Sequence, residues 1–92
     1  MIFGIEQKYI IEDATNERVV ATKIMFTNQG TDVVFINDVT LLAGDIFKVD
    51  IEAPHMVDFS FSIRFEPATV IVAGDGISSG SKLLLTTMKP KG

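Results

Sequence analysis

Apolar and polar residues alternate without a break between Asp58 and Glu66. Phe, Phe, Ile and Phe occupy every second position, and Asp, Ser, Ser, Arg and Glu fill the places between them. Successive side chains of a β-strand point to opposite faces, so this segment has one apolar face and one polar face. The pattern predicts a strand that covers a core on one side and meets water on the other.

Shorter segments of strand character recur along the chain, separated by turn residues. We expect strands at 5–11, 18–27, 33–36, 39–42, 46–51, 58–66, 69–73 and 82–88. No window of eleven or more residues shows helical spacing of its apolar positions. The 92 residues therefore predict one all-β domain over residues 1–92, a small antiparallel β-sandwich of about seven or eight strands that is immunoglobulin-like or jelly-roll-like.

Three local features carry more detailed predictions. In segment 18–27, Val20 shares one face with Ile24 and Phe26 if the strand is continuous. The pair Asn37-Asp38 predicts a two-residue type I′ hairpin, because both residue types tolerate the left-handed region. The polar residues 12–17 predict a turn or a single helical turn, and Pro90 is expected to end the last strand.

The composition leaves few ways to build a catalytic or metal site. The chain has no cysteine and one histidine, His55, and its carboxylates are scattered, so we expect no metal and no cofactor. His55, Asp58 and Ser60 could be joined as a triad, but nothing supplies a nucleophile elbow or an oxyanion hole. We expect His55 to be an exposed turn residue, with a pH-sensing role as the alternative. Residues 74–76 resemble part of a calcium loop without its downstream glutamate, which favours a plain turn.

Charge argues against nucleic acid as a partner, since the net charge is −4 and phosphate binding needs a basic surface. Residues 1–81 hold twelve acids and five bases, a balance of −7, and residues 82–92 hold three lysines and no acid. We expect this basic end to be frayed; the alternative is an arm that docks on an acidic neighbouring subunit. We also expect no signal peptide and no membrane-spanning segment, because the first residues lack a basic stretch and no apolar run is long enough.

The apolar content is high for so small a domain, at 47% with a mean hydropathy of +0.33. Three segments, 33–36, 70–72 and 83–85, are apolar at consecutive positions, unlike a strand with one wet face. Exposed apolar patches mark contact sites, so we expect an oligomer or larger assembly rather than a monomer. The candidate partner interface consists of Val70, Ile71, Val72, Leu83, Leu84 and Leu85.

A run of turn and core positions resembles a known pattern. The run comprises Ile24–Asp32, Val34, Asn37, Val39, Leu41, Gly44, Asp45 and Phe47. Over about residues 24–65 it resembles small immunoglobulin-like β-sandwich virion proteins of bacteriophages. The resemblance implies a non-enzymatic structural protein present in many copies, such as a capsid decoration, head-fibre or tail-associated subunit. Its location would be the virion, or the cytoplasm of the producing cell.

A second class of function stays open. A ligand- or glycan-binding module, resembling an adhesin, would use the loops 28–32, 53–57 and 74–81. The absence of tryptophan and the single tyrosine disfavour a sugar-stacking platform. The sequence therefore favours protein partners, with binding of a small ligand as the alternative and an enzyme in third place.

Overall fold

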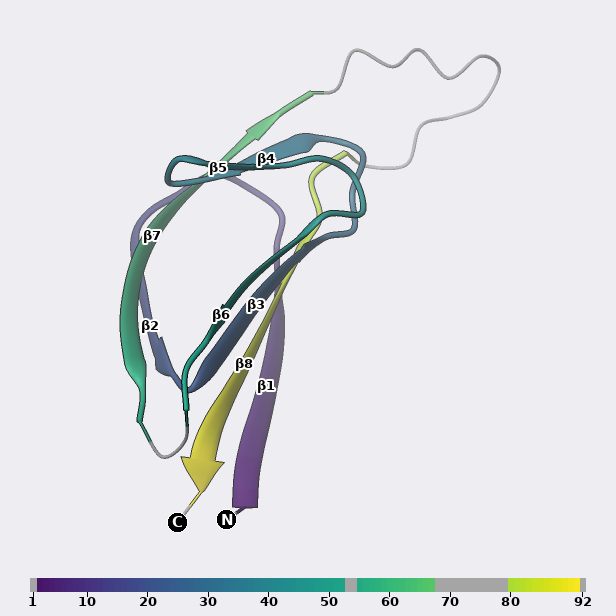
Figure 1. The fold of residues 1–92 in the computed structure, drawn as a ribbon. Helices are drawn as coiled ribbons and strands as arrows, with labels where there is room; N and C mark the ends of the chain where they lie inside the picture. The colour runs from purple at the N-terminus through teal and green to yellow at the C-terminus, as the bar shows by residue number, and fades with distance from the viewer. Residues whose placement is uncertain (1, 53–54, 68–79, 92) are drawn as a thin grey trace.

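The computed structural model describes residues 2–52, 55–67 and 80–91. This part of the chain contains eight strands and no helix (Figure 1). Their bounds are β1 Ile2–Ile10, β2 Ala14–Ala21, β3 Lys23–Asn28, β4 Val33–Ile36, β5 Val39–Leu41, β6 Ile46–Asp50, β7 Val57–Glu66 and β8 Leu83–Lys91. The strand expected at 69–73 lies outside the described residues.

The strands pair in a nested order. β1 pairs with β8, β2 with β7, β3 with β6 and β4 with β5, all antiparallel. Two further antiparallel pairs, β3 with β8 and β4 with β7, join these hairpin-like units side by side. The result is sheet A, in the order β1-β8-β3-β6, and sheet B, in the order β2-β7-β4-β5.

The predicted all-β antiparallel sandwich is confirmed. A nested set of antiparallel strands rolled into two four-stranded sheets is the jelly-roll arrangement, one of the two that the sequence left open. In an immunoglobulin domain the first two strands are neighbours in one sheet, whereas here β1 and β2 lie in different sheets. Among the eight described strands, only β4 and β5 are consecutive in sequence and lie in the same sheet.

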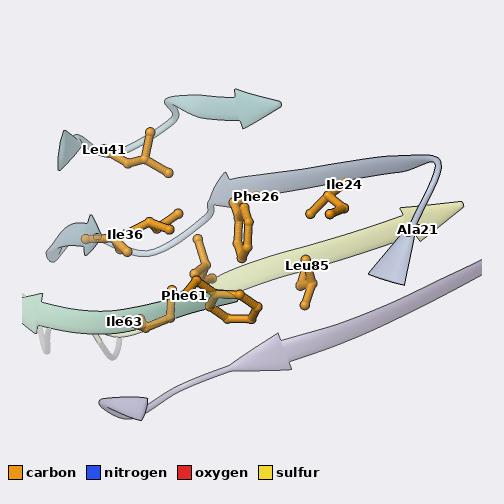
Figure 2. Packing of buried hydrophobic residues seen from close by; sticks show 10 residues of the cluster. Ala21, Ile24, Phe26, Ile36, Leu41, Phe61, Ile63 and Leu85 are labelled. Atoms are coloured by element: carbon orange, nitrogen blue, oxygen red, sulfur yellow. The ribbon is translucent and has the colours of Figure 1, made fainter. Parts of the chain in front are cut away.

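An aromatic cluster fills the middle of the space between the sheets. The ring of Phe26, which is fully buried, lies 5.2 Å from Phe61, 6.1 Å from Phe59 and 6.2 Å from Phe47, centroid to centroid. Phe26 and Phe47 come from sheet A, and Phe59 and Phe61 come from sheet B. Figure 2 shows Phe26 and Phe61 directed toward each other from opposite sheets, with aliphatic side chains on either side. The rings therefore join the two layers.

The alternation in residues 58–66 appears in β7 as predicted. Phe61 and Ile63 are buried, whereas Ser60, Ser62 and Arg64 are exposed. The strand thus has its apolar face in the core and its polar face in water.

The predicted hairpin at Asn37-Asp38 is confirmed in its register, with Ile36 opposite Val39. The turn differs in detail from type I′. Asn37 has a φ of 52°, but Asp38 is not among the described residues with positive φ, and a type I′ turn requires both.

The continuous strand expected at 18–27 is wrong. The chain crosses from sheet B to sheet A at Thr22, so the segment is divided between β2 and β3. Thr22 is buried at this corner, and its hydroxyl donates to the carbonyl of His55 at 2.9 Å. The crossing changes which residues face inward: Ala21 is buried with Ile24, and Val20 is not.

Two expectations about polar segments are also corrected. Residues 14–17 belong to β2, where the register shifts and Asn16 takes a φ of 57°, so the expected turn or helical turn is an irregularity within a strand. The basic end is not frayed, because β8 lies between β1 and β3 in sheet A. β8 also continues through Pro90, which is tolerated because β3 begins opposite Met88 and Pro90 is paired only with β1.

Replacing Phe61 with Ala tests the role of the aromatic cluster. The side chain is 4% exposed, and we expect Phe61→Ala to lower the free energy of unfolding by about 3–5 kcal/mol, because a cavity replaces the ring. Urea unfolding followed by circular dichroism measures the change. Ser60→Ala, on the solvent side of the same strand, is the matched control and should stay within about 0.5 kcal/mol of the wild type. Equal losses in both variants would contradict the assignment of the two faces.

Candidate protein interface

The outer face of sheet B is mostly polar and partly neutralised by ion pairs, and its apolar residues Val20, Val33 and Phe35 are partly buried. Arg18 donates to both carboxylate oxygens of Asp58, at 2.7 Å and 2.6 Å, between neighbouring strands β2 and β7. This hydrogen-bonded contact with a carboxylate raises the pKa of Arg18 above its ordinary value. Arg64 pairs with Glu66 and also lies over the ring of Phe35, 4.3 Å from its centroid. The one aromatic side chain on this face is thus covered by a cation.

The outer face of sheet A has more exposed apolar side chains, beside an ion pair of Lys23 with Asp50 at 3.5 Å and a Lys82 ammonium 5.0 Å from the centroid of the Tyr9 ring. Because Ile24, Phe26, Leu83 and Leu85 point into the core, the residues between them point outward. Cross-strand registers then arrange the outward residues in rows: Tyr9, Leu84, Thr27 and Ile46 in one, and Gln7, Thr86, Met25 and Lys48 in the next. A third row contains Ile5, Met88, Lys23 and Asp50. We define the outer apolar face as Ile5, Tyr9, Met25, Ile46, Leu84 and Met88.

Three side chains of the outer apolar face are more than half exposed. The exposed fractions are 62% for Ile5, 54% for Tyr9 and 56% for Ile46. The other large apolar side chains that are exposed in the described part of the chain, Ile11, Leu42 and Met56, lie in connections between strands. Exposed apolar surface on a strand therefore gathers on sheet A.

The structure divides the interface predicted from sequence. Leu83 and Leu85 are 0% and 3% exposed and pack in the core, so their place in that interface is wrong. Of the three leucines 83–85, only Leu84 points outward along β8, into the outer apolar face. Val70, Ile71 and Val72 lie outside the described residues.

Sequence reasoning missed Ile5, Tyr9 and Ile46. A signal for the first two exists in β1, where the charged residues Glu6 and Lys8 alternate with Ile5, Gln7 and Tyr9. A strand with charges on one side is expected to turn its apolar side to the core. Here β1 lies at the edge of sheet A, and Glu6 and Lys8 share their face with Leu85 and Thr87, the inward residues of β8.

The three residues considered for catalysis do not form a triad. The Asp58 carboxylate is held by Arg18 in the bidentate pair, on the outer face of sheet B. His55 is exposed, and its backbone carbonyl accepts the hydrogen bond from Thr22. Ser60 neighbours Asp58 on the exposed face of β7. This arrangement provides no nucleophile activated by a neighbouring base.

Loop 28–32, which the binding-module alternative would use, is internally bonded. The amide nitrogen of Asn28 donates to the carbonyls of Asp32 at 2.8 Å and Leu41 at 3.1 Å. Its amide oxygen accepts from the Gly30 N–H at 3.1 Å. Asn28 is 1% exposed, so its polar atoms serve the fold and are closed to a ligand.

The same loop packs tightly against the segment before β8. The Gly80 carbonyl accepts from the Asp32 N–H at 2.8 Å, and the Ser81 hydroxyl donates to the Asp32 carboxylate at 2.7 Å. A Cβ on Gly30 would overlap the Gly80 carbonyl oxygen, so this contact requires glycine. Of the other two loops considered, residues 53–54 and 74–79 lie outside the described part.

Comparisons with known proteins add no assignment. No family model, curated protein or solved structure matches the chain. Among the described residues, no group of three or more potential ligands gathers as a metal site, and no helix is present that could cross a membrane. The distribution of apolar side chains between the two outer faces is therefore the feature that bears on function.

The hydrogen bonds of Asn28 can be tested by removing the side-chain amide. We expect Asn28→Ala to lower the free energy of unfolding by about 2–4 kcal/mol, because buried carbonyl and N–H groups lose their partners. Chemical unfolding measures the loss, and Gln29→Ala, at the neighbouring exposed position, serves as the control. An Asn28→Ala protein as stable as the control would show that water replaces the amide, contrary to this interpretation.

Proposed function

We propose that this protein is a non-enzymatic structural subunit that packs into a larger protein assembly through the outer apolar face of sheet A. The observation that carries the proposal is the contrast between the two outer faces. Sheet B presents serines and ion-paired side chains to water, whereas sheet A presents Ile5, Tyr9 and Ile46 at more than half of their full exposure. Monomeric proteins rarely leave such apolar patches uncovered, so a partner that covers this face is favoured.

We further propose that the assembly is a phage particle. The resemblance of residues 24–65 to immunoglobulin-like virion β-sandwich proteins supports this context through local turn and core positions only, because the strand order is not the immunoglobulin one. The jelly-roll arrangement supports it by analogy at the level of fold alone, since jelly rolls occur in viral capsid proteins and also in lectins and cupins. The genes on either side of the one encoding this protein provide a direct check. Capsid or tail genes there would support the proposal, and a set of metabolic genes would contradict it.

Substitution at Ile46 tests the interface itself. Ile46 lies on edge strand β6 of sheet A, and Thr40 lies on edge strand β5 of sheet B, both exposed on outer faces. We expect Ile46→Lys to weaken association roughly tenfold or more, because a charge would have to lose its water in the interface. Thr40→Lys should associate as the wild type does. Light scattering over a range of concentrations measures both.

The outcomes are distinct. Concentration-dependent growth of the wild-type mass that Ile46→Lys suppresses and Thr40→Lys leaves unchanged supports the outer apolar face as an interface. A wild type that stays monomeric at millimolar concentration would overturn the assembly proposal. Equal weakening by both lysines would show that added charge, and not its position, causes the effect.

A further inference from the structure

Strand β1 lies at the edge of sheet A as far as the described residues show. It pairs with β8 from Ile2 to Ile10, and no strand of the described residues pairs with its other side. An exposed edge presents a row of unpaired N–H and C=O groups that can pair with a strand of another chain. Proteins commonly blunt such edges with prolines or short strands, yet this one is nine residues long and contains no proline.

The inner side of β1 is open as well. A cavity of about 140 Å³ lies between β1 and β2 and is lined by residues that include Glu6, Lys8, Arg18 and Phe61. Glu6 and Lys8 are exposed, and neither takes part in an ion pair within the described residues. On its inner face, β1 thus presents Glu6 and Lys8, which have no ion-pair partner among the described residues. On its outer face it presents the exposed side chains of Ile5 and Tyr9.

We propose that β1 pairs with β1 of a second copy of this chain, antiparallel and centred on Gln7. In this register Glu6 lies opposite Lys8 of the second copy, and Lys8 lies opposite its Glu6. Ile5 lies opposite Tyr9 of the second copy in the same way, on the outer face. The strand is therefore complementary to itself, as the interface of a two-fold dimer must be. Opposite charges that face each other across a strand pair stabilise it.

Neighbouring registers lack this complementarity. Residues that face each other across two strands lie on the same side of the sheet, so a two-fold pair is centred on a residue. Centring on Glu6 places two glutamates opposite each other, and centring on Lys8 places two lysines opposite each other. Like charges directly opposite destabilise a strand pair. Centring on Ile5 pairs Glu6 with Gly4 and leaves its charge unmatched.

The dimer would join two copies of sheet A into one sheet of eight strands, based on the four strands of each copy. The two-fold axis is perpendicular to this sheet, so both outer apolar faces lie on the same side and meet at Ile5 and Tyr9. This inference rests on the proposed function and deepens it by naming a partner, a second copy. The edge contact and the face contact use different residues, Glu6 and Lys8 for the first and Ile46 for the second, so they can be tested separately.

Charge reversal tests the register. Glu6→Lys alone and Lys8→Glu alone each place like charges opposite in both symmetric pairs, and we expect the dimer dissociation constant to rise about tenfold or more in each. The double variant Glu6→Lys/Lys8→Glu restores opposite charges and should dimerise like the wild type. A mixture of the two single variants should form a heterodimer, because one strand then carries two lysines and the other two glutamates. Sedimentation velocity at low salt measures all four samples, and thermal unfolding checks that each variant is folded.

A cysteine introduced at the centre gives an independent readout. The chain has no cysteine of its own, so Gln7→Cys places a single thiol on the proposed two-fold axis. Cα atoms of facing residues in an antiparallel pair lie about 4.5–5.5 Å apart, which a disulfide can span. We expect mild oxidation to give a covalent dimer within minutes, whereas Ser60→Cys on the outer face of sheet B should react far more slowly.

The results separate this inference from the proposed function. The β1 pairing is overturned by two results together. The single-reversal variants, the double variant and the mixture would all associate like the wild type, and Gln7→Cys would form a disulfide no faster than Ser60→Cys. In that case Glu6 and Lys8 are inward charges that keep the edge unpaired. Suppression of association by Ile46→Lys would still support the outer apolar face. Rescue by the double reversal with no effect of Ile46→Lys would support the edge pairing alone.

Discussion

The arrangement of the two sheets depends on the buried amide of Asn28. This residue ends β3, where the chain leaves sheet A, and its amide nitrogen reaches the carbonyl of Leu41 at the end of β5 in sheet B. Its backbone carbonyl accepts from the Gly44 N–H at 2.8 Å, and its N–H donates to the Asp45 carbonyl at 3.0 Å. One short polar side chain thus forms hydrogen bonds with backbone groups in the loop after β3 and at the end of β5. An apolar residue there would leave several buried polar groups without partners.

The core accounts for only part of the apolar composition. The aromatic cluster around Phe26 uses the inward positions of β3, β6 and β7. Further apolar side chains lie on both outer faces. Val20, Val33 and Phe35 on sheet B are partly buried, whereas Ile5, Tyr9 and Ile46 on sheet A are more than half exposed. A sandwich needs one apolar face per sheet, and the apolar strand residues most exposed on a second, outer face are those of sheet A. The asymmetry between the sheets, and not the total apolar content, is the observation that supports the proposed assembly.

Local patterns predicted the fold well where each residue's environment depends on its neighbours in sequence. The alternation in β7 and the hairpin at Asn37 are of this kind. The corner at Thr22 was not predictable, because neither Ala21 nor Lys23 is a turn former and the crossing depends on hydrogen bonds to His55 and Ile51. The outer apolar face was predicted only at Leu84, since apolar residues at consecutive positions do not reveal which of them face the core. Knowledge of the sheet partner of each strand was needed to make that distinction.

The nested pairing of the strands orders events in time as the protein is made. The hairpin between β4 and β5 closes over two residues, whereas β1 and β8 join the two ends of the chain, with Ile2 opposite Lys91 (Figure 1). Contacts between distant residues form late, because the entropy of closing a long loop opposes them. The outer face of sheet A needs β8 between β1 and β3, so this surface cannot form before β8 has been synthesised. A nascent chain that lacks β8 therefore cannot present the completed face.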